Sequence, residues 1–281
     1  MSILVAGSLH LDVVVSAPHL PGLDETVTGD SVDYVFGGKG GNQAVAAARM
    51  GAQVGFAGRA GSDRFGDMLR ETLSSNHVDT TQLQQDEGPS GMSIAIVNAD
   101  GEYGAVIVSA ANLKIDASQI TVPETTSLVL LQNEIPQEVN LAVAEKARAV
   151  GANIWLNAAP ARGVPDALIR LVDLLIVNRV EAAFYADDLL QVDRLTTLGA
   201  EGVLYHGKTY PGHKVPVIST HGAGDVFVGA MAARVANGAA LPEAIGFAQA
   251  AAALHVSSEL QDRSHLSAAR VERFLSRQVN R

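Results

Sequence analysis

The sequence predicts an α/β fold with a mainly parallel sheet and a smaller separate β-sheet. From residue 128 onward, short apolar runs alternate with helical segments, the order typical of parallel strands joined by crossover helices. Residues 21–34 and 91–109 are instead rich in β-forming side chains, and the second segment contains a hairpin-turn signal at 98–101. With 47% hydrophobic but only 5% aromatic residues, the core must consist mainly of Ala, Val, Leu and Ile, which suits buried parallel strands.

The predicted elements follow one another along a single domain, residues 1–281. The first half begins with strands at 3–7 and 13–16 and a helix at 42–50. The second half has strands at 128–132, 153–157 and 174–177, helices at 136–150 and 165–171, an Ala-rich helix that starts near residue 222, and a further helix at 247–256. A chain of 281 residues without repeats or low-complexity tracts can form one large α/β core.

Charge and cysteine content exclude several functional classes. The net charge is −10, with 30 acidic and 20 basic residues, which argues against nucleic acid or an anionic membrane as a partner. The absence of cysteine excludes disulfides, thiolate zinc ligands and cysteine nucleophiles, and agrees with a reducing compartment. No basic signal segment begins the sequence, and no apolar stretch approaches the ~20 residues of a membrane span. We therefore expect a cytoplasmic protein.

The tetrad Gly222-Ala223-Gly224-Asp225 opens the Ala-rich helix near the C-terminus. Because its first three side chains are small or absent, the backbone N–H groups can converge on an anion, and the helix dipole adds positive charge there. Asp225 could take a proton from an attacking hydroxyl beside this anion hole, which indicates phosphoryl transfer to an alcohol. Taken alone, the tetrad also fits an ordinary helix start with Asp225 as a capping residue.

A second glycine-rich segment, residues 36–43, places four glycines within five residues around Lys39. Such a cluster indicates positive φ angles or close backbone approach to a ligand, because glycine is otherwise entropically unfavourable. Lys39 and Asn42 supply polar groups from this loop. The segment has neither the spacing of a Walker A loop nor that of a dinucleotide-binding fingerprint.

Together these motifs resemble the signatures of the ribokinase-like (PfkB) family of carbohydrate kinases, and within it the ribokinases. Further similar segments occur in family order at Gly7-Ser8 with Asp12, at 61–66, at 157–161, at Asn178 with Glu181, and at 197–203. The resemblance covers nearly the whole chain. It implies a three-layer α/β/α sandwich with a mainly parallel central sheet and a small β-sheet lid, formed by about residues 17–34 and 91–110. It also implies a homodimer through the lid.

The resemblance further implies the role of each site residue in a transfer of the γ-phosphoryl group of ATP to a primary sugar hydroxyl, with ribose or a related pentose as the sugar. Asp225 would be the base, and Gly222, Ala223 and Gly224 would hold the migrating group. Sugar hydroxyls would be bound by His10, Asp12, Gly38, Lys39, Asn42 and Glu134. The nucleotide would be bound by Asn178, Thr197, Leu198, Gly199 and Gly202, and Glu181 would organise Mg²⁺ through water.

Three departures from the family pattern leave alternatives open. His10 stands where ribokinases carry Asn, so the preferred sugar can differ from ribose. The run 257–264 lacks the Gly-Ala pair of the family's potassium-binding loop, which puts activation by a monovalent cation in doubt. The stretch 182–195 is shorter than the family norm, which predicts a thinner nucleotide wall and weak selection between ATP and GTP.

Two alternative functions remain candidates. The protein can be a kinase of another small substrate, namely fructose, a nucleoside or a sugar phosphate, or it can be a sugar-binding paralogue with weakened turnover. A sugar-phosphate kinase needs extra basic residues, for which the candidates are Arg59, Arg64 and Lys114. A nucleoside kinase needs a stacking aromatic residue, for which the candidates are Phe36 and Tyr103.

Overall fold

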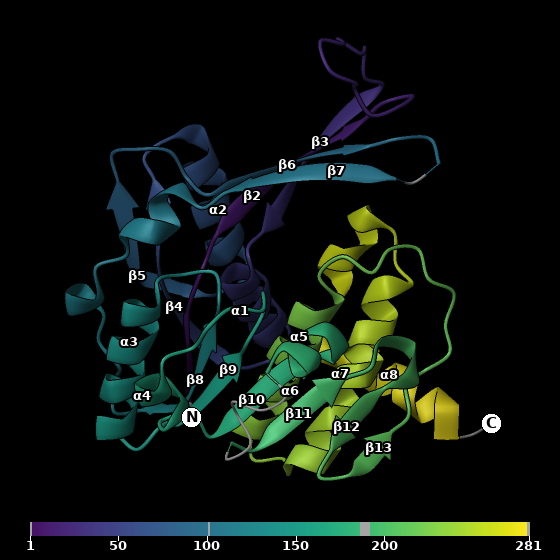
Figure 1. Cartoon of the computed structure of the whole chain (residues 1–281). Coiled ribbons are helices and arrows are strands. Elements are labelled where there is room, and N and C mark those ends of the chain that lie inside the picture. The colour runs from purple at the N-terminus through teal and green to yellow at the C-terminus, as the bar shows by residue number, and fades with distance from the viewer. Residues whose placement is uncertain (1, 101, 186–191, 280–281) are drawn as a thin grey trace.

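The computed structural model describes residues 2–100, 102–185 and 192–279, and Figure 1 shows a large central sheet with a small sheet at one end. The large sheet has nine strands in the order β13-β12-β11-β10-β9-β8-β1-β4-β5. Its parallel part consists of β1 (Ser2–Ala6), β4 (Gln53–Gly61), β5 (Asp79–Asp86), β8 (Thr126–Gln132), β9 (Asn153–Asn157), β10 (Leu174–Asn178) and β11 (Arg194–Thr197). The last two strands at one end of the sheet, β12 (Val203–Tyr205) and β13 (Lys208–Tyr210), pair antiparallel. The predicted mainly parallel sheet is confirmed.

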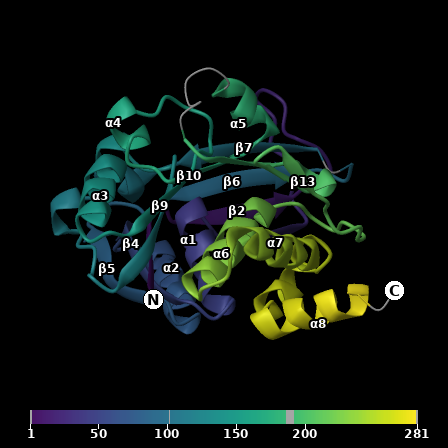
Figure 2. The same cartoon turned by 90° about the horizontal axis from the view of Figure 1, so that it is seen from below.

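Helices cover both faces of this sheet, which gives the predicted three layers (Figure 2). One face carries α3 (Gln137–Ala149), α4 (Asp166–Ile169) and α5 (Arg179–Phe184). The other carries α1 (Lys39–Arg49), α2 (Arg64–Ser75), α6 (Ala223–Ala236), α7 (Leu241–Val256) and α8 (Ala268–Val279). In the described part of the chain, no helix has both the length and the apolar character that crossing a membrane requires.

The central strand β1 shows how the sequence divides the core between the two faces. Side chains alternate along a strand, so Ile3 and Val5 pack with the helix layer that contains α1 and α6, whereas Leu4 and Ala6 pack with the layer that contains α3. All four are almost completely buried. The neighbouring strand β8 and the strand β10 are likewise mainly apolar and buried, whereas the edge strand β5 is largely polar and partly exposed.

The small sheet has the order β3-β2-β6-β7, with β2 at His10–Ser16, β3 at Ser31–Gly37, β6 at Met92–Val97 and β7 at Tyr103–Val108. Strands β6 and β7 lie within residues 91–110. The predicted first half is displaced, because the strand precedes residue 17 and residues 17–30 contain no strand. Pro18 and Pro21 lack the N–H group that a sheet ladder needs, which explains why strand pairing stops there.

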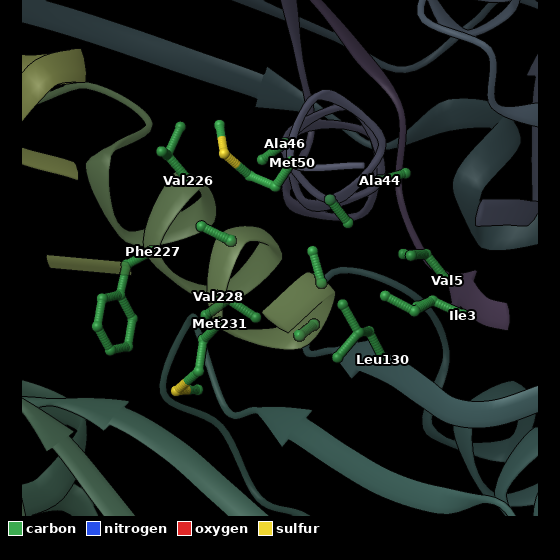
Figure 3. Close-up of a cluster of buried hydrophobic side chains, with 14 of the residues drawn as sticks. Ile3, Val5, Ala44, Ala46, Met50, Leu130, Val226, Phe227, Val228 and Met231 are labelled. Atoms are coloured by element: carbon green, nitrogen blue, oxygen red, sulfur yellow. The ribbon is translucent and has the colours of Figure 1, made fainter. Parts of the chain in front are cut away.

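Helices α1 and α6 pack closely beside β1, and Figure 3 shows buried side chains between them, including Ala46, Met50 and Val226. Gly229 makes this approach possible, because a Cβ atom there would lie 2.5 Å from the Gln43 carbonyl oxygen and 2.7 Å from Ala46 Cβ. The close contact fixes the N-terminus of α6 relative to that of α1.

We predict that Gly229→Ala lowers the free energy of unfolding by about 1–3 kcal/mol, the usual cost of overpacking a dense core. The added methyl group meets backbone atoms, which cannot rotate away. Denaturant unfolding of the purified protein measures the change.

The matched control is Gly246→Ala on α7, where an added Cβ has no atom within 4 Å. This variant should gain up to about 1 kcal/mol, because alanine favours a helix interior over glycine. Equal stability of the two variants would contradict the proposed role of the α1–α6 contact.

Candidate active site

Helices α1 and α6 both begin at a cavity of about 250 Å³ beside the carboxyl ends of the central strands. The final residues of β9, β10 and β11, which are Asn157, Asn178 and Thr197, line this cavity together with Lys39 and residues 222–225. Open parallel sheets bind ligands at this edge, where the helix N-termini also point. The topology thus brings together motifs that lie almost 200 residues apart in the sequence.

The glycine-rich segment at 37–41 serves mainly the approach of α1 to the end of β1. Gly38 has a φ of 86° and precedes the first turn of α1, which begins at Lys39 rather than at the predicted residue 42. A Cβ at Gly40 would lie 2.7 Å from the Cα of Gly7. These glycines therefore allow two backbones to meet, and the contact holds the Lys39 side chain at the cavity.

Asp225 lies in the first turn of α6 with only 7% of its surface exposed. The Gln43 side-chain amide donates to its Oδ1 at 3.0 Å, and Asn42 Nδ2 lies 3.4 Å from its Oδ2. Burial raises the pKa of Asp225, while Lys39 and the Gln43 hydrogen bond favour its charged form. A buried carboxylate with a raised pKa is suited to accept a proton.

A chain of buried amides holds Gln43 in place. Gln132 Nε2 donates to Gln43 Oε1 at 2.9 Å, and Gln43 Nε2 also lies 3.0 Å from Asn157 Oδ1. Gln43 and Gln132 are fully buried. The sequence did not indicate a role for Gln43. It directly follows Asn42 in the glycine-rich motif, but nothing in the local pattern shows that its amide reaches residue 225.

Lys39 lies at the centre of the site and is surrounded by acidic groups. Its backbone N–H donates to Glu134 Oε2 at 2.8 Å, and this oxygen also accepts from Ser8 Oγ at 2.5 Å. Burial alone would lower the pKa of Lys39, but the carboxylates of Asp225, Glu134 and Glu181 outweigh it and raise the pKa. The ammonium group is therefore charged and electrostatically linked to all three.

The small sheet contributes Asp12 and His10 to the opposite side of the site. Asp12 is buried and accepts a hydrogen bond of 2.5 Å from Ser93 Oγ, which lies across from it on β6. Burial lowers the pKa of His10, so its imidazole is neutral at pH 7. Because Asn112 Nδ2 donates to His10 Nε2 at 3.3 Å, the proton of the ring is assigned to Nδ1, 4.0 Å from Glu134 Oε2.

His221 is a site residue that sequence reasoning missed. It directly precedes the tetrad, and its Nε2 atom lies 3.6 Å from Asp12 Oδ2 on the small sheet. Interaction with the Asp12 carboxylate raises the pKa of His221. The only available signal was its position beside Gly222, because the contact with Asp12 joins segments about 200 residues apart.

The tetrad provides free backbone donors at the start of α6. Gly222 has a φ of 74°, which side chains rarely adopt, and an added Cβ at Gly224 would have no atom within 4 Å. The N–H of Ala223 donates to the Thr220 carbonyl at 3.2 Å. Within the part of the chain that the structure describes, the N–H groups of Gly222, Gly224 and Asp225 have no acceptor. The three N–H groups available to an anion are therefore those of Gly222, Gly224 and Asp225. The prediction named Ala223 instead of Asp225.

Asn178 and Glu181 form a capping box at the start of α5. The Asn178 side chain accepts from the Glu181 N–H at 2.9 Å, and Glu181 Oε2 accepts from the Asn178 N–H at 2.8 Å. The second Glu181 oxygen takes no part in the box. Burial raises the pKa of Glu181, whereas Lys39 favours its charged form. Both residues line the cavity, so one carboxylate oxygen is available there to a cation or its water shell.

The other residues that were predicted to bind the nucleotide lie in two different places. Thr197 lines the cavity, whereas Leu198, Gly199 and Gly202 form the turn between β11 and β12, closed by a bond of 2.8 Å from the Leu198 N–H to the Gly202 carbonyl. Gly202 packs closely, since a Cβ there would lie 2.0 Å from the Tyr210 carbonyl oxygen. Of the shortened stretch 182–195, residues 186–191 lie outside the described residues.

The candidates for other substrates do not gather at this cavity. Arg59 and Lys114 both pair with Asp86, at 3.1 and 3.0 Å. Arg64 is exposed at the start of α2, and Phe36 packs against the core. The Tyr103 side chain lies outside the described part of the structure. Arg59, Arg64, Lys114 and Phe36 are not among the residues that line the cavity.

Comparison with known proteins agrees with this arrangement. The model of the pfkB family of carbohydrate kinases matches residues 2–266. Ribokinase from Bacillus subtilis is 35% identical over 92% of this chain and 93% of its own, and ribokinase from Haemophilus influenzae is 32% identical over the same shares. The structure of Arabidopsis thaliana ribokinase complexed with ribose and ATP is similar with a TM-score of 0.88 and 27% identity, over 98% of each chain. The chain belongs to the pfkB family of carbohydrate kinases.

Proposed function

We propose that this protein is an ATP-dependent sugar kinase that phosphorylates a primary hydroxyl of ribose or a related pentose. The observation that carries the proposal is the buried carboxylate of Asp225 beside free backbone amides, between the polar groups of the small sheet and the cavity at the strand ends. The relatives named ribokinase support the sugar class. A coupled assay of ADP release over pentoses, hexoses and nucleosides tests it. A preference for nucleosides or sugar phosphates would replace the proposed substrate.

Each residue has a distinct task in the proposed reaction. Asp12, His10, Asn42 and Glu134 hold the sugar hydroxyls, while Gly38 and Lys39 shape the wall beside them. Asp225 takes the proton of the primary hydroxyl, whose oxygen then attacks the γ-phosphorus of ATP. The bond from that phosphorus to the β–γ bridging oxygen breaks, and ADP leaves. The free amides and the Lys39 ammonium stabilise the charge on the transferred group.

Mg²⁺ bound to the triphosphate would neutralise charge during the transfer. The described residues contain no cluster of three or more His, Asp or Glu side chains that could hold a metal. Glu181 therefore fits as a single carboxylate that binds the hydrated ion through water, since Mg²⁺ retains water and takes phosphate ligands. Asn178 and Thr197 line the nucleotide side of the same cavity, with Leu198, Gly199 and Gly202 proposed to shape its edge. A cytosolic location, where ATP is available, completes the proposal.

We predict that Asp225→Asn lowers kcat by about two to four orders of magnitude, the usual contribution of a positioned general base. The amide keeps the size of the side chain, so the dissociation constant of the sugar should stay within a few-fold of that of the wild type. Steady-state kinetics and calorimetry measure the two quantities. Near-normal turnover would remove Asp225 from the mechanism.

We also predict that kcat/KM falls on the acidic side of its pH profile (the acidic limb) with an apparent pKa above about 4, the ordinary pKa of aspartate. Burial raises the pKa of Asp225, so activity is lost as the pH falls through that raised value. Because burial raises the pKa of Glu181 as well, a variant must identify the group. Gln43→Met removes a hydrogen bond that favours charged Asp225, so the limb should move to still higher pH.

The matched control for this pH profile is Gln249→Met, another buried amide, which donates to the Tyr210 carbonyl and does not contact Asp225. Its limb should coincide with that of the wild type. An unmoved limb in Gln43→Met would show that a group other than Asp225 titrates.

We further propose that two copies pair through the small sheets. The strand register places Val32, Tyr34, Ile94, Val106 and Val108 on the sheet face opposite to Asp12 and Ser93. These five apolar side chains are between 44% and 65% exposed. A contiguous apolar face of this kind marks an interaction surface. The inner face, which carries Asp12, would then close over the sugar as a lid.

We predict that Val106→Lys converts the dimer to a monomer in light scattering coupled to size exclusion, because a charged group would be buried in the interface. Ile107→Lys is the matched control, since Ile107 is equally exposed (64%) but points to the other face of β7. A wild-type monomer, or dissociation by both variants alike, would contradict an interface on this face.

A further inference from the structure

Three backbone carbonyl groups beside the catalytic tetrad converge on the side chain of Arg263. Its Nη2 atom donates to the Ser219 carbonyl at 3.2 Å, its Nη1 to the His221 carbonyl at 3.4 Å, and its Nε to the Ser258 carbonyl at 3.3 Å. Ser219 and His221 belong to the loop that leads into α6, and Ser258 follows the end of α7. One guanidinium group therefore joins two loops.

Other contacts strengthen this junction. The Ile218 N–H donates to the Val256 carbonyl at 2.8 Å, and the His255 ring lies 2.8 Å from the His221 carbonyl through Nε2. His221 directly precedes Gly222, where the backbone turns into α6. The position of this loop therefore determines where the free amides of Gly222, Gly224 and Asp225 point.

Carbonyl oxygens that converge on one point create a site for a cation, because the negative ends of their dipoles face each other. An arginine side chain can provide the positive charge at such a site, because its planar guanidinium group is charged at every physiological pH and offers several fixed hydrogen-bond donors. Here all three of its nitrogen atoms are engaged by the carbonyls.

In the family that the chain resembles, the potassium-binding loop follows the helix that ends here at Val256, but residues 257–264 lack its Gly-Ala pair. The residues present do not fit that ion. The carbonyls of this segment and of the loop before the tetrad are already bound to a positive charge, and a second cation among them would be repelled by the guanidinium.

We propose that Arg263 is a positioning residue that holds the loop before the tetrad in place of a monovalent cation, so that turnover does not depend on potassium. The inference rests on the proposed kinase activity.

The test compares rates in potassium chloride and in choline chloride at equal ionic strength. The wild type should have the same kcat in both salts. In Arg263→Ala, kcat should fall by about 10²-fold, the scale for a displaced catalytic group, while the KM for the sugar stays near that of the wild type. Added potassium or guanidinium ions should restore part of the lost kcat, and Arg263→Lys should retain more of it than Arg263→Ala.

Arg273→Ala is the matched control, because it removes the same charge from an exposed position on α8. It should behave like the wild type in both salts. Activation of the wild type by potassium would overturn the proposal, and so would an Arg263→Ala variant with unchanged kcat.

A second readout separates this inference from the proposed function. If no sugar is phosphorylated, the kinase proposal fails, but thermal unfolding still reports on the cation. The Tm of the wild type should be the same in potassium and choline chloride, whereas Arg263→Ala should gain Tm from potassium specifically. A potassium-specific rise in the wild-type Tm, or no such rise in the variant, would overturn the role of Arg263.

Discussion

The candidate active site depends on how one buried carboxyl group, that of Asp225, is supported by its neighbours. A buried carboxylate is costly unless hydrogen bonds and positive charge compensate it, and a hydrogen bond to a charged group contributes about 1.5–3 kcal/mol. Here the compensation comes from Gln43 and Asn42 on α1, from the charge of Lys39 at the same helix, and from the N-terminus of α6. The close packing of α1 and α6 at Gly229 therefore serves the proposed chemistry as well as the core.

The small sheet links the proposed sugar binding to the proposed assembly, because its two faces differ in chemistry. Successive residues of a strand point to opposite faces, so Asp12 and Ser93 face the site while Val13 and Ile94 belong to the apolar outer face. Contact between His221 and Asp12 connects this sheet to the loop before α6. Arg263 donates hydrogen bonds to the Ser219 and His221 carbonyls of the same loop. The loop that precedes the tetrad amides is therefore contacted by Asp12 of the small sheet and by Arg263.

Many residues of the candidate site stand out in the sequence. The tetrad 222–225, the segment around Lys39 and the pair Asn178 and Glu181 are short motifs, and their resemblance to family signatures implied a role that each motif alone left ambiguous. The structure brings them to one cavity, as expected for loops at the carboxyl ends of parallel strands. The predicted strand segment was wrong at 17–30, where prolines interrupt the β-forming residues. The predicted start of α1 was also wrong, because the helix includes glycines that were expected to form a loop.

The sequence by itself determined the class of fold and the order of the strands and helices in the second half, because these follow from the period of the apolar residues. It also identified the glycine-rich motifs, whose conformational freedom is a local property, and their resemblance to a known family implied the proposed catalytic role. Only the tertiary structure decided the contacts between distant segments, such as Gln43 with Asp225, His221 with Asp12, and Arg263 with the Ser219 and His221 carbonyls. The physical reason is that a hydrogen bond between residues far apart in sequence depends on how the elements pack, and side-chain type alone leaves its partner unspecified.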